Sequence, residues 1–207
     1  MTDYTAFAEL SPTAFANVVT QDRVVDLGIH PLWSGMARIA GPAYTVRCPA
    51  GDNLMLHAAI YRASPGSIVV VEAGDTKYAV AGGNVCAVAQ LHGIAAFLVD
   101  GVIRDVAESR ENGFPIFARG VVPIPGAKET LGELNVPIVC GGVRVSPGDI
   151  VVADEEGIVI IERDKSQEVL ERAQAIAAVE ATTSLESWES AHTVKIEQLL
   201  REKGFIG

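Results

Sequence analysis

The clearest pattern along the chain is a pair of short apolar runs separated by one helix-length segment. Ile68–Val71 consists only of β-branched residues and Ile94–Val99 only of apolar ones, which is typical of strands buried on both faces. Residues 84–92 lie between them with helical texture, and Gly93 ends that segment. Because a strand, a crossover helix and a second strand pair in parallel, this pattern predicts an α/β sheet.

The segments before this unit predict helices, one strand and a further helix. The first forty residues have helical texture, broken by prolines and glycines. Ala43–Cys48 alternates apolar and polar residues, as a half-buried strand does. Residues 54–63 follow as a helix that Asp52 or Asn53 could cap.

After the second apolar run, the pattern predicts a turn, a helix and then a β-rich region. Asp100-Gly101 is typical of a turn, residues 105–112 have helical texture, and Pro115–Ala118 is a further short strand. Residues 150–161 hold two apolar runs around an Asp-Glu-Glu-Gly turn, which indicates a hairpin.

The chain is expected to form a single domain over residues 1–207. Its length suits one core, and it shows no internal repeat or linker. From Asp164 it is expected to be helical to its end, with one break near residues 182–184.

The charge balance narrows the possible partners. Sixteen basic and 26 acidic residues give a formal net charge of −10, and no basic run exceeds two residues. A protein that binds phosphate backbones needs a basic footprint, so we expect neither nucleic acid nor an anionic membrane as a partner. No apolar stretch approaches the ~20 residues that span a bilayer, and the first ten residues lack an export signal. With three dispersed cysteines, these features predict a cytoplasmic location.

The first candidate site is Gly82-Gly83-Asn84, at the start of the predicted crossover helix. Two glycines let the backbone approach a ligand closely, and the first amides of a helix favour an anion such as a carboxylate or phosphate. The alternative is that these glycines form only a turn.

The second candidate site is Arg104, Asp105 and Glu108, which follow the second buried strand. Ligands bind at this edge of α/β sheets, where an arginine can hold a carboxylate and an aspartate a divalent cation. The alternative is structural: Asp105 and Glu108 have the spacing of a capping box, and Arg104 and Glu108 that of an ordinary i, i+4 ion pair.

The remaining polar residues point away from covalent catalysis. The four histidines are scattered, and His57 and His92 lie on apolar-rich helical stretches, where a structural role is expected. The cysteines lack a partnered histidine motif, and no serine lies in a nucleophile elbow.

The two candidate sites together are far more specific than either one. Gly83, Arg104, Asp105 and Glu108 form the pattern G-x20-R-D-x2-E, which resembles the motif of the RraA-like family. That family includes class II 4-hydroxy-4-methyl-2-oxoglutarate / 4-carboxy-4-hydroxy-2-oxoadipate aldolases and regulators of ribonuclease E. The flanking segments are also similar, and the likeness runs from about Ile39 to Ile161.

The resemblance implies a fold, an assembly and a set of roles. The implied fold is a single α-β-β-α domain of the swivelling kind, assembled as a homotrimer or hexamer. A divalent metal, Mg²⁺ or Mn²⁺, would bind Asp105, and Arg104 would bind the oxygen of a small keto acid. The substrate carboxylate would be held by the backbone amides of Gly82, Gly83, Asn84 and Val85.

The implied activity is that of a metal-dependent lyase. It would cleave a 4-hydroxy-2-oxo acid to pyruvate and a second keto acid, and oxaloacetate decarboxylation would pass through the same enolate. Many aldolases of the family have aspartate where this chain has Gly83, and there it orients a proton-carrying water. Glu108 is the nearest acidic candidate for that role here. The alternative function is a non-catalytic protein-binding regulator of a ribonuclease.

Overall fold

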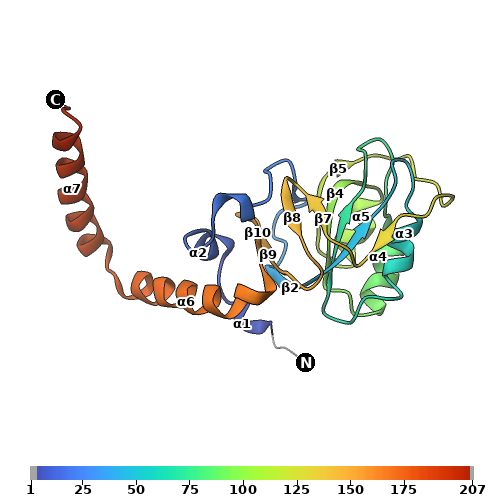
Figure 1. The fold of residues 1–207 in the computed structure, drawn as a ribbon, viewed down its shortest axis with the longest axis horizontal. Coiled ribbons are helices and arrows are strands. Elements are labelled where there is room, and N and C mark those ends of the chain that lie inside the picture. The colour runs from blue at the N-terminus through green and yellow to red at the C-terminus, as the bar shows by residue number, and fades with distance from the viewer. Residues whose placement is uncertain (1–3, 206–207) are drawn as a thin grey trace.

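The computed structural model describes residues 4–205, and its centre is a mixed β-sheet (Figure 1). The four inner strands β2 to β5 pair in parallel, and β9 and β10 extend the sheet in antiparallel pairing. The strand order is β1 (His30–Pro31), β5 (Ile116–Val121), β4 (Ala96–Ile103), β3 (Ile68–Glu72), β2 (Ile39–Arg47), β9 (Ile150–Asp154) and β10 (Gly157–Ile161), with β6 (Glu133–Leu134) beside β2.

Helices cover the two outer sides of this β structure, so that the layers follow the order α-β-β-α. On the first side lie α3 (Leu54–Ala59), α4 (Gly83–Leu91) and α5 (Val106–Glu111). On the second side α1 (Thr5–Ala8), α2 (Pro12–Ala16) and α6 (Ser166–Thr182) pack against β9 and β10. The small hairpin β7 (Ile138–Cys140) and β8 (Val143–Val145) packs in the middle layer. The predicted fold class is confirmed.

The wholly apolar strands are explained by burial on both faces. Alternate residues of β4 contribute to different cores: Phe97 and Val99 pack toward α3 and α4, whereas Ala96 and Leu98 pack toward β7 to β10. All four residues are fully buried. Since neither face of the strand meets water, no polar alternation is expected or found.

Several predicted boundaries were wrong. Asp100-Gly101 is not a turn, because β4 continues to Ile103, with an irregularity in its pairing with β5 between Val99 and Val102. The helix predicted over residues 54–63 ends at Ala59.

The amino-terminal segment is less helical than predicted. Beyond α1 and α2 it holds only a 3-10 turn, Gln21–Arg23, before β1. Residues 1–3, part of the segment searched for an export signal, lie outside the described residues.

The carboxyl-terminal segment contains two long helices. After a 3-10 turn, Arg163–Lys165, α6 is followed by α7 (Leu185–Glu202), and the predicted break between them is confirmed. The helix does not run to the chain end, because Gly204 has a φ of +73°, which ends α7; residues 206 and 207 lie outside the described part. Within residues 4–205, no helix has the length and apolar character needed to cross a membrane.

Candidate functional site

The two predicted site segments meet in space. Arg104 and Asp105 leave the carboxyl end of β4, beside the start of α4. The backbone N–H of Arg104 donates to the Ala81 carbonyl at 2.9 Å, and the N–H of Gly83 donates to Asp105 Oδ2 at 3.2 Å. The glycine loop and the Arg-Asp pair therefore belong to one site.

Asp105 does not act as a helix cap. It occupies the N-cap position of α5, but its side chain accepts no capping hydrogen bond there and instead contacts the start of α4. Its backbone is left-handed, with φ 56° and ψ 40°, a conformation that costs about 1–3 kcal/mol and is concentrated at functional sites. The capping-box interpretation of Asp105 is wrong, because the left-handed backbone turns its carboxylate toward Gly83.

The two glycines are required by the carboxylates above them. A Cβ on Gly82 would lie 2.5 Å from Asp105 Oδ2, and a Cβ on Gly83 would overlap the carboxylate of Glu108. Glu108 therefore fills the space that a side chain at residue 83 would need. The glycines are more than a turn, since they let two carboxylates approach the first turn of α4.

Arg104 pairs with Asp105 rather than with Glu108. Arg104 Nε lies 3.3 Å from Asp105 Oδ2, with side chains 42% and 38% exposed. Among the described residues the predicted i, i+4 ion pair of Arg104 with Glu108 is absent, so that interpretation is wrong as well. The partial exposure leaves both groups accessible to a ligand.

Gly82, Arg104 and Asp105 line a cavity of about 80 Å³ at the start of α4, whereas Gly83 and Glu108 lie outside its lining. Asn84 and Val85 also line it, and the first intrahelical donor of α4 is the N–H of Cys86, which bonds to Gly82. The N–H groups of residues 84 and 85 therefore precede the helical ladder and are available to an anion. Further lining residues are Asn53, His57, Ala79, Ala81, Pro125 and Lys128.

Asn53 carries a buried acceptor without a partner. The residue is 3% exposed, and its Nδ2 donates to the carbonyls of Ala79 and Gly126, both at 3.3 Å. Its Oδ1 has no hydrogen-bond partner. Because an unsatisfied buried acceptor costs about 1–3 kcal/mol, this atom is suited to accept a hydrogen bond from a ligand hydroxyl or water.

His57 and Lys128 also line the cavity. Burial, aided by the positive charge of Lys128, lowers the pKa of His57 to about 4, so this imidazole is neutral at pH 7. The Lys128 loop is held by Asp52, whose Oδ2 accepts the N–H groups of Glu129 and Thr130 at 2.7 and 2.9 Å. Burial would raise the pKa of Asp52, but these and a third backbone donor lower it below its ordinary value.

Sequence reasoning missed the cavity roles of Asn53, His57 and Lys128. Asn53 was considered only as a cap, and although it occupies that position, it is Asp52 whose side chain accepts the N–H of Leu54. Lys128 lies in a turn-rich segment with no local signal. The one available signal was Asn53 itself, a polar residue at the start of an apolar helix, because a buried polar side chain needs a hydrogen-bond partner.

The donor set at the site fits a hard divalent cation. The carboxylates of Asp105 and Glu108 lie over the consecutive glycines Gly82 and Gly83. Within residues 4–205 there is no group of three or more side chains that could together ligate a metal, so this site offers at most two protein carboxylates. Mg²⁺ is usually bound by one or two carboxylates and keeps several waters, so two carboxylates open to solvent match its preference.

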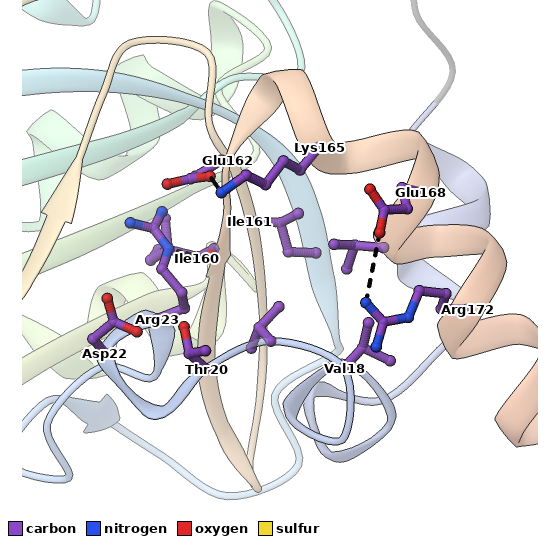
Figure 2. A pocket seen from close by; sticks show the side chains of 12 residues that line it. Val18, Thr20, Asp22, Arg23, Ile160, Ile161, Glu162, Lys165, Glu168 and Arg172 are labelled. Atoms are coloured by element: carbon purple, nitrogen blue, oxygen red, sulfur yellow. Dashed lines mark hydrogen bonds and ion pairs between the residues drawn. The ribbon is translucent and has the colours of Figure 1, made fainter.

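Another cleft, beside α6, has a different character (Figure 2). A cavity of about 250 Å³ lies between α6, β10 and residues 18–23, with an apolar floor. Its rim charges are paired, Lys165 with Glu162 and Arg172 with Glu168. Because these pairs neutralise each other and no motif residue lines it, this cleft is separate from the candidate site.

Known proteins of one family are similar to this chain. A model of the RraA-like family, described as Aldolase/RraA, matches residues 8–160. A Halalkalibacterium halodurans protein named "Putative 4-hydroxy-4-methyl-2-oxoglutarate aldolase" is 44% identical over 138 residues, 66% of each chain. A Burkholderia multivorans protein of the same name is 35% identical over 67% of this chain and 84% of that one.

A solved structure is similar as well. Streptomyces coelicolor RraAS2, described as an unusual member of the RNase ES inhibitor RraA protein family, has a TM-score of 0.76 and 29% identity. The match covers 86% of this chain and 93% of that one.

Proposed function

Because the chain belongs to the RraA-like family, we propose that it is an aldolase that cleaves a 4-hydroxy-2-oxo acid to pyruvate and a second keto acid. The names of two relatives support a carbon–carbon lyase. The observation that carries the proposal is the convergence of Arg104, Asp105 and the free amides of α4 in one cavity. A keto acid presents a carboxylate and a carbonyl oxygen, which match these two kinds of donor.

The protein groups divide the work of binding and charge stabilisation. The N–H groups of Asn84 and Val85 hold the substrate carboxylate, where the positive end of the α4 dipole favours an anion. The guanidinium of Arg104 donates to the keto oxygen, where negative charge develops as the carbon–carbon bond breaks. Lys128, which also lines the cavity, adds a second positive charge.

We propose that Asp105 and Glu108 hold Mg²⁺ or Mn²⁺ beside the keto acid. When bound, such a cation withdraws electron density from the keto group without a covalent intermediate. Glu108 also accepts, through a water, the proton of the substrate hydroxyl, and Asn53 Oδ1 accepts a hydrogen bond from that hydroxyl or water. Oxaloacetate decarboxylation needs the same keto-acid contacts, so we expect the site to support it.

Pyruvate release from 4-hydroxy-4-methyl-2-oxoglutarate and from oxaloacetate tests the proposal. We expect turnover with Mg²⁺ or Mn²⁺, its loss in EDTA, and its return when metal is restored. Turnover that persists after EDTA treatment would contradict the metal dependence, and no turnover on any 4-hydroxy-2-oxo acid would contradict the lyase.

A second candidate function is supported by the likeness to RraAS2, described within a family of ribonuclease inhibitors. The net charge of −10 suits an acidic protein that covers a basic RNA-binding segment. This function predicts inhibition of a ribonuclease in stoichiometric amounts. Asp105→Asn separates the two candidates, because it removes a cavity carboxylate and leaves the outer surface nearly unchanged.

A further inference from the structure

Within residues 106–111, the described extent of α5, the one fully buried residue is polar. Ser109 is 0% exposed, whereas the other five residues of the helix are at least partly exposed. A buried hydroxyl needs hydrogen-bond partners, and Ser109 has two. Its Oγ donates to the Asp105 carbonyl at 3.4 Å, and its side chain forms a hydrogen bond with the Cys86 thiol of α4. Ser109 therefore links α4 to the residue that begins α5.

The two hydrogen bonds of Ser109 are compatible with each other in direction. Cys86 is fully buried, and burial raises the pKa of its thiol to about 11, although the hydrogen bond with Ser109 lowers it. The thiol is therefore protonated at about pH 7 and can donate to Ser109 Oγ, while the hydroxyl hydrogen is directed to Asp105. Cys86 also closes the first turn of α4, because its N–H donates to the Gly82 carbonyl at 3.0 Å.

Asp105 needs such support, because its left-handed backbone is unfavourable and persists only where surrounding contacts fix it. Its carboxylate contacts the Gly83 N–H and Arg104 Nε at 3.2 and 3.3 Å, but this side chain is 38% exposed and water competes there. The Asp105 carbonyl instead accepts both the N–H and the hydroxyl of the fully buried Ser109, at 3.3 and 3.4 Å. Hydrogen bonds that are shielded from water are the stronger ones.

We propose that Ser109 and Cys86 are positioning residues, whose buried hydrogen bonds hold the left-handed backbone of Asp105 and so keep its carboxylate over the first turn of α4. The catalytic meaning of this placement rests on the proposed function, in which the carboxylate holds a divalent cation. The placement itself does not depend on a bound metal.

A second link between the same two helices provides a matched control. Gln90 Nε2, near the end of α4, donates to the carbonyl of Asn112, which directly follows α5, at 3.1 Å. This bond is exposed and lies at the ends of the helices away from Gly83 and Asp105. If the Cys86–Ser109 link only packed α5 against α4, loss of either link would have the same consequence.

The first test needs neither metal nor substrate. Gly83 N–H donates only to Asp105 Oδ2 among the described residues, so its hydrogen exchange, measured by NMR, reports whether the carboxylate is in place. We expect this amide to exchange at least ~10-fold faster in Ser109→Ala, because loss of a buried hydrogen bond favours local opening. In Gln90→Ala we expect wild-type exchange. No acceleration in Ser109→Ala, or an equal acceleration in Gln90→Ala, would overturn the proposal.

The second test measures Mn²⁺ affinity, from the electron paramagnetic resonance signal of free Mn²⁺ during a titration of the protein without substrate. We expect Ser109→Ala and Cys86→Ala to weaken binding by about 10- to 100-fold, the usual effect of removing a group that orients a metal ligand. Cys86→Ser keeps a donor for Ser109 Oγ and should restore most of the affinity that Cys86→Ala loses, and Gln90→Ala should bind as the wild type does.

The two tests separate failure of this proposal from failure of the proposed function. A wild-type protein that binds no Mn²⁺ would contradict the cation site, and the exchange of Gly83 N–H would still decide whether Ser109 positions Asp105. A wild type that binds Mn²⁺ no more tightly than Ser109→Ala would overturn the positioning role and leave the cation site supported. Equal affinities of Cys86→Ser and Cys86→Ala, both weakened, would remove the thiol hydrogen bond from the account and overturn the part assigned to Cys86.

Discussion

The two ends of the segment Asp100–Asp105 hold the same residue type in opposite situations. Asp100 lies within β4, and both of its carboxylate oxygens are used: Oδ1 accepts from Arg119 Nε at 2.5 Å and Oδ2 from the Gly141 N–H at 2.7 Å. Asp105 follows the strand with a left-handed backbone and uses one oxygen, Oδ2, at 3.2 Å from Gly83 N.

The difference lies in how much of each carboxylate's hydrogen-bonding capacity the fold itself uses. Asp100 links β4 to β5 and to the hairpin of β7 and β8, so its bonding capacity serves the fold. Asp105 keeps unused capacity at a cavity, next to Arg104 and the free amides of α4. A ligand can form new hydrogen bonds with Asp105, whereas at Asp100 it would first have to displace the bonds from Arg119 and Gly141.

The largest expected effect is on activity, from Asp105→Asn. Asparagine tolerates the left-handed backbone, so the melting temperature should change by less than about 2 °C. If Asp105 holds the cation as proposed, loss of its charge should lower pyruvate formation by more than ~100-fold, since replacing a residue that only orients a metal ligand already costs about 10- to 100-fold. An active Asp105→Asn enzyme would place this residue with Asp100, as a structural group.

Glu108→Gln should lower turnover by ~100-fold if Glu108 moves the substrate proton through a water. Thermal unfolding should be unaffected, because the Glu108 side chain makes no capping bond to α5.

Gly83→Asp adds a sharper comparison: its side chain overlaps Glu108, so it should be tolerated only when Glu108 is shortened to alanine. Equal activity of Gly83→Asp with and without Glu108→Ala would contradict this steric account.

Asp100→Ala should affect stability rather than chemistry. It leaves Arg119 Nε and the Gly141 N–H without their acceptor, while Arg119 Nη1 keeps its bond to Asp26. This loss should cost about 1–3 kcal/mol and lower the melting temperature by several degrees. The specific activity of the folded fraction should stay near that of the wild type. An inactive Asp100→Ala protein with an unchanged melting temperature would reverse the comparison.

Arg104→Lys keeps the charge but removes the planar fork. The rate should fall at least ~10-fold, equivalent to ~1.4 kcal/mol of transition-state stabilisation. Steady-state kinetics should show the loss in kcat, because the developing oxyanion is contacted in the transition state. The matched control is Arg119→Lys, which should lower stability and leave kcat unchanged.

The last prediction is a pH dependence of stability, which arises from His57. In the unfolded chain this residue binds a proton below about pH 6.5, whereas burial holds its pKa at about 4 in the fold. The unfolded state therefore binds more protons between these values, so the free energy of unfolding falls as the pH drops through this window. Urea unfolding at about pH 5 and about pH 7 should show a smaller difference in His57→Gln than in the wild type.

The sequence by itself determined the core strands, the hairpin and the break between the last helices. Ile68–Val71 and residues 96–99 of the second apolar run were predictable, because a wholly apolar run favours a strand buried on both faces. The motif residues Gly83, Arg104 and Asp105 were also predicted as one site, through the resemblance of their joint spacing to a family motif. The structure brings them together because β4 ends beside the start of α4.

Only the tertiary structure decided which polar groups share the cavity and which aspartate is free. Asn53 and Lys128 lie 75 residues apart, and their meeting depends on the bonds of Asp52 to a loop that carries no local pattern. Asp100 looked like a turn residue because the Asp-Gly pair has the same local chemistry in a turn as in an irregular strand. The local pattern of apolar and polar residues indicates which side chains are buried. The hydrogen-bond partner of a buried polar atom, however, is supplied by segments distant in the chain.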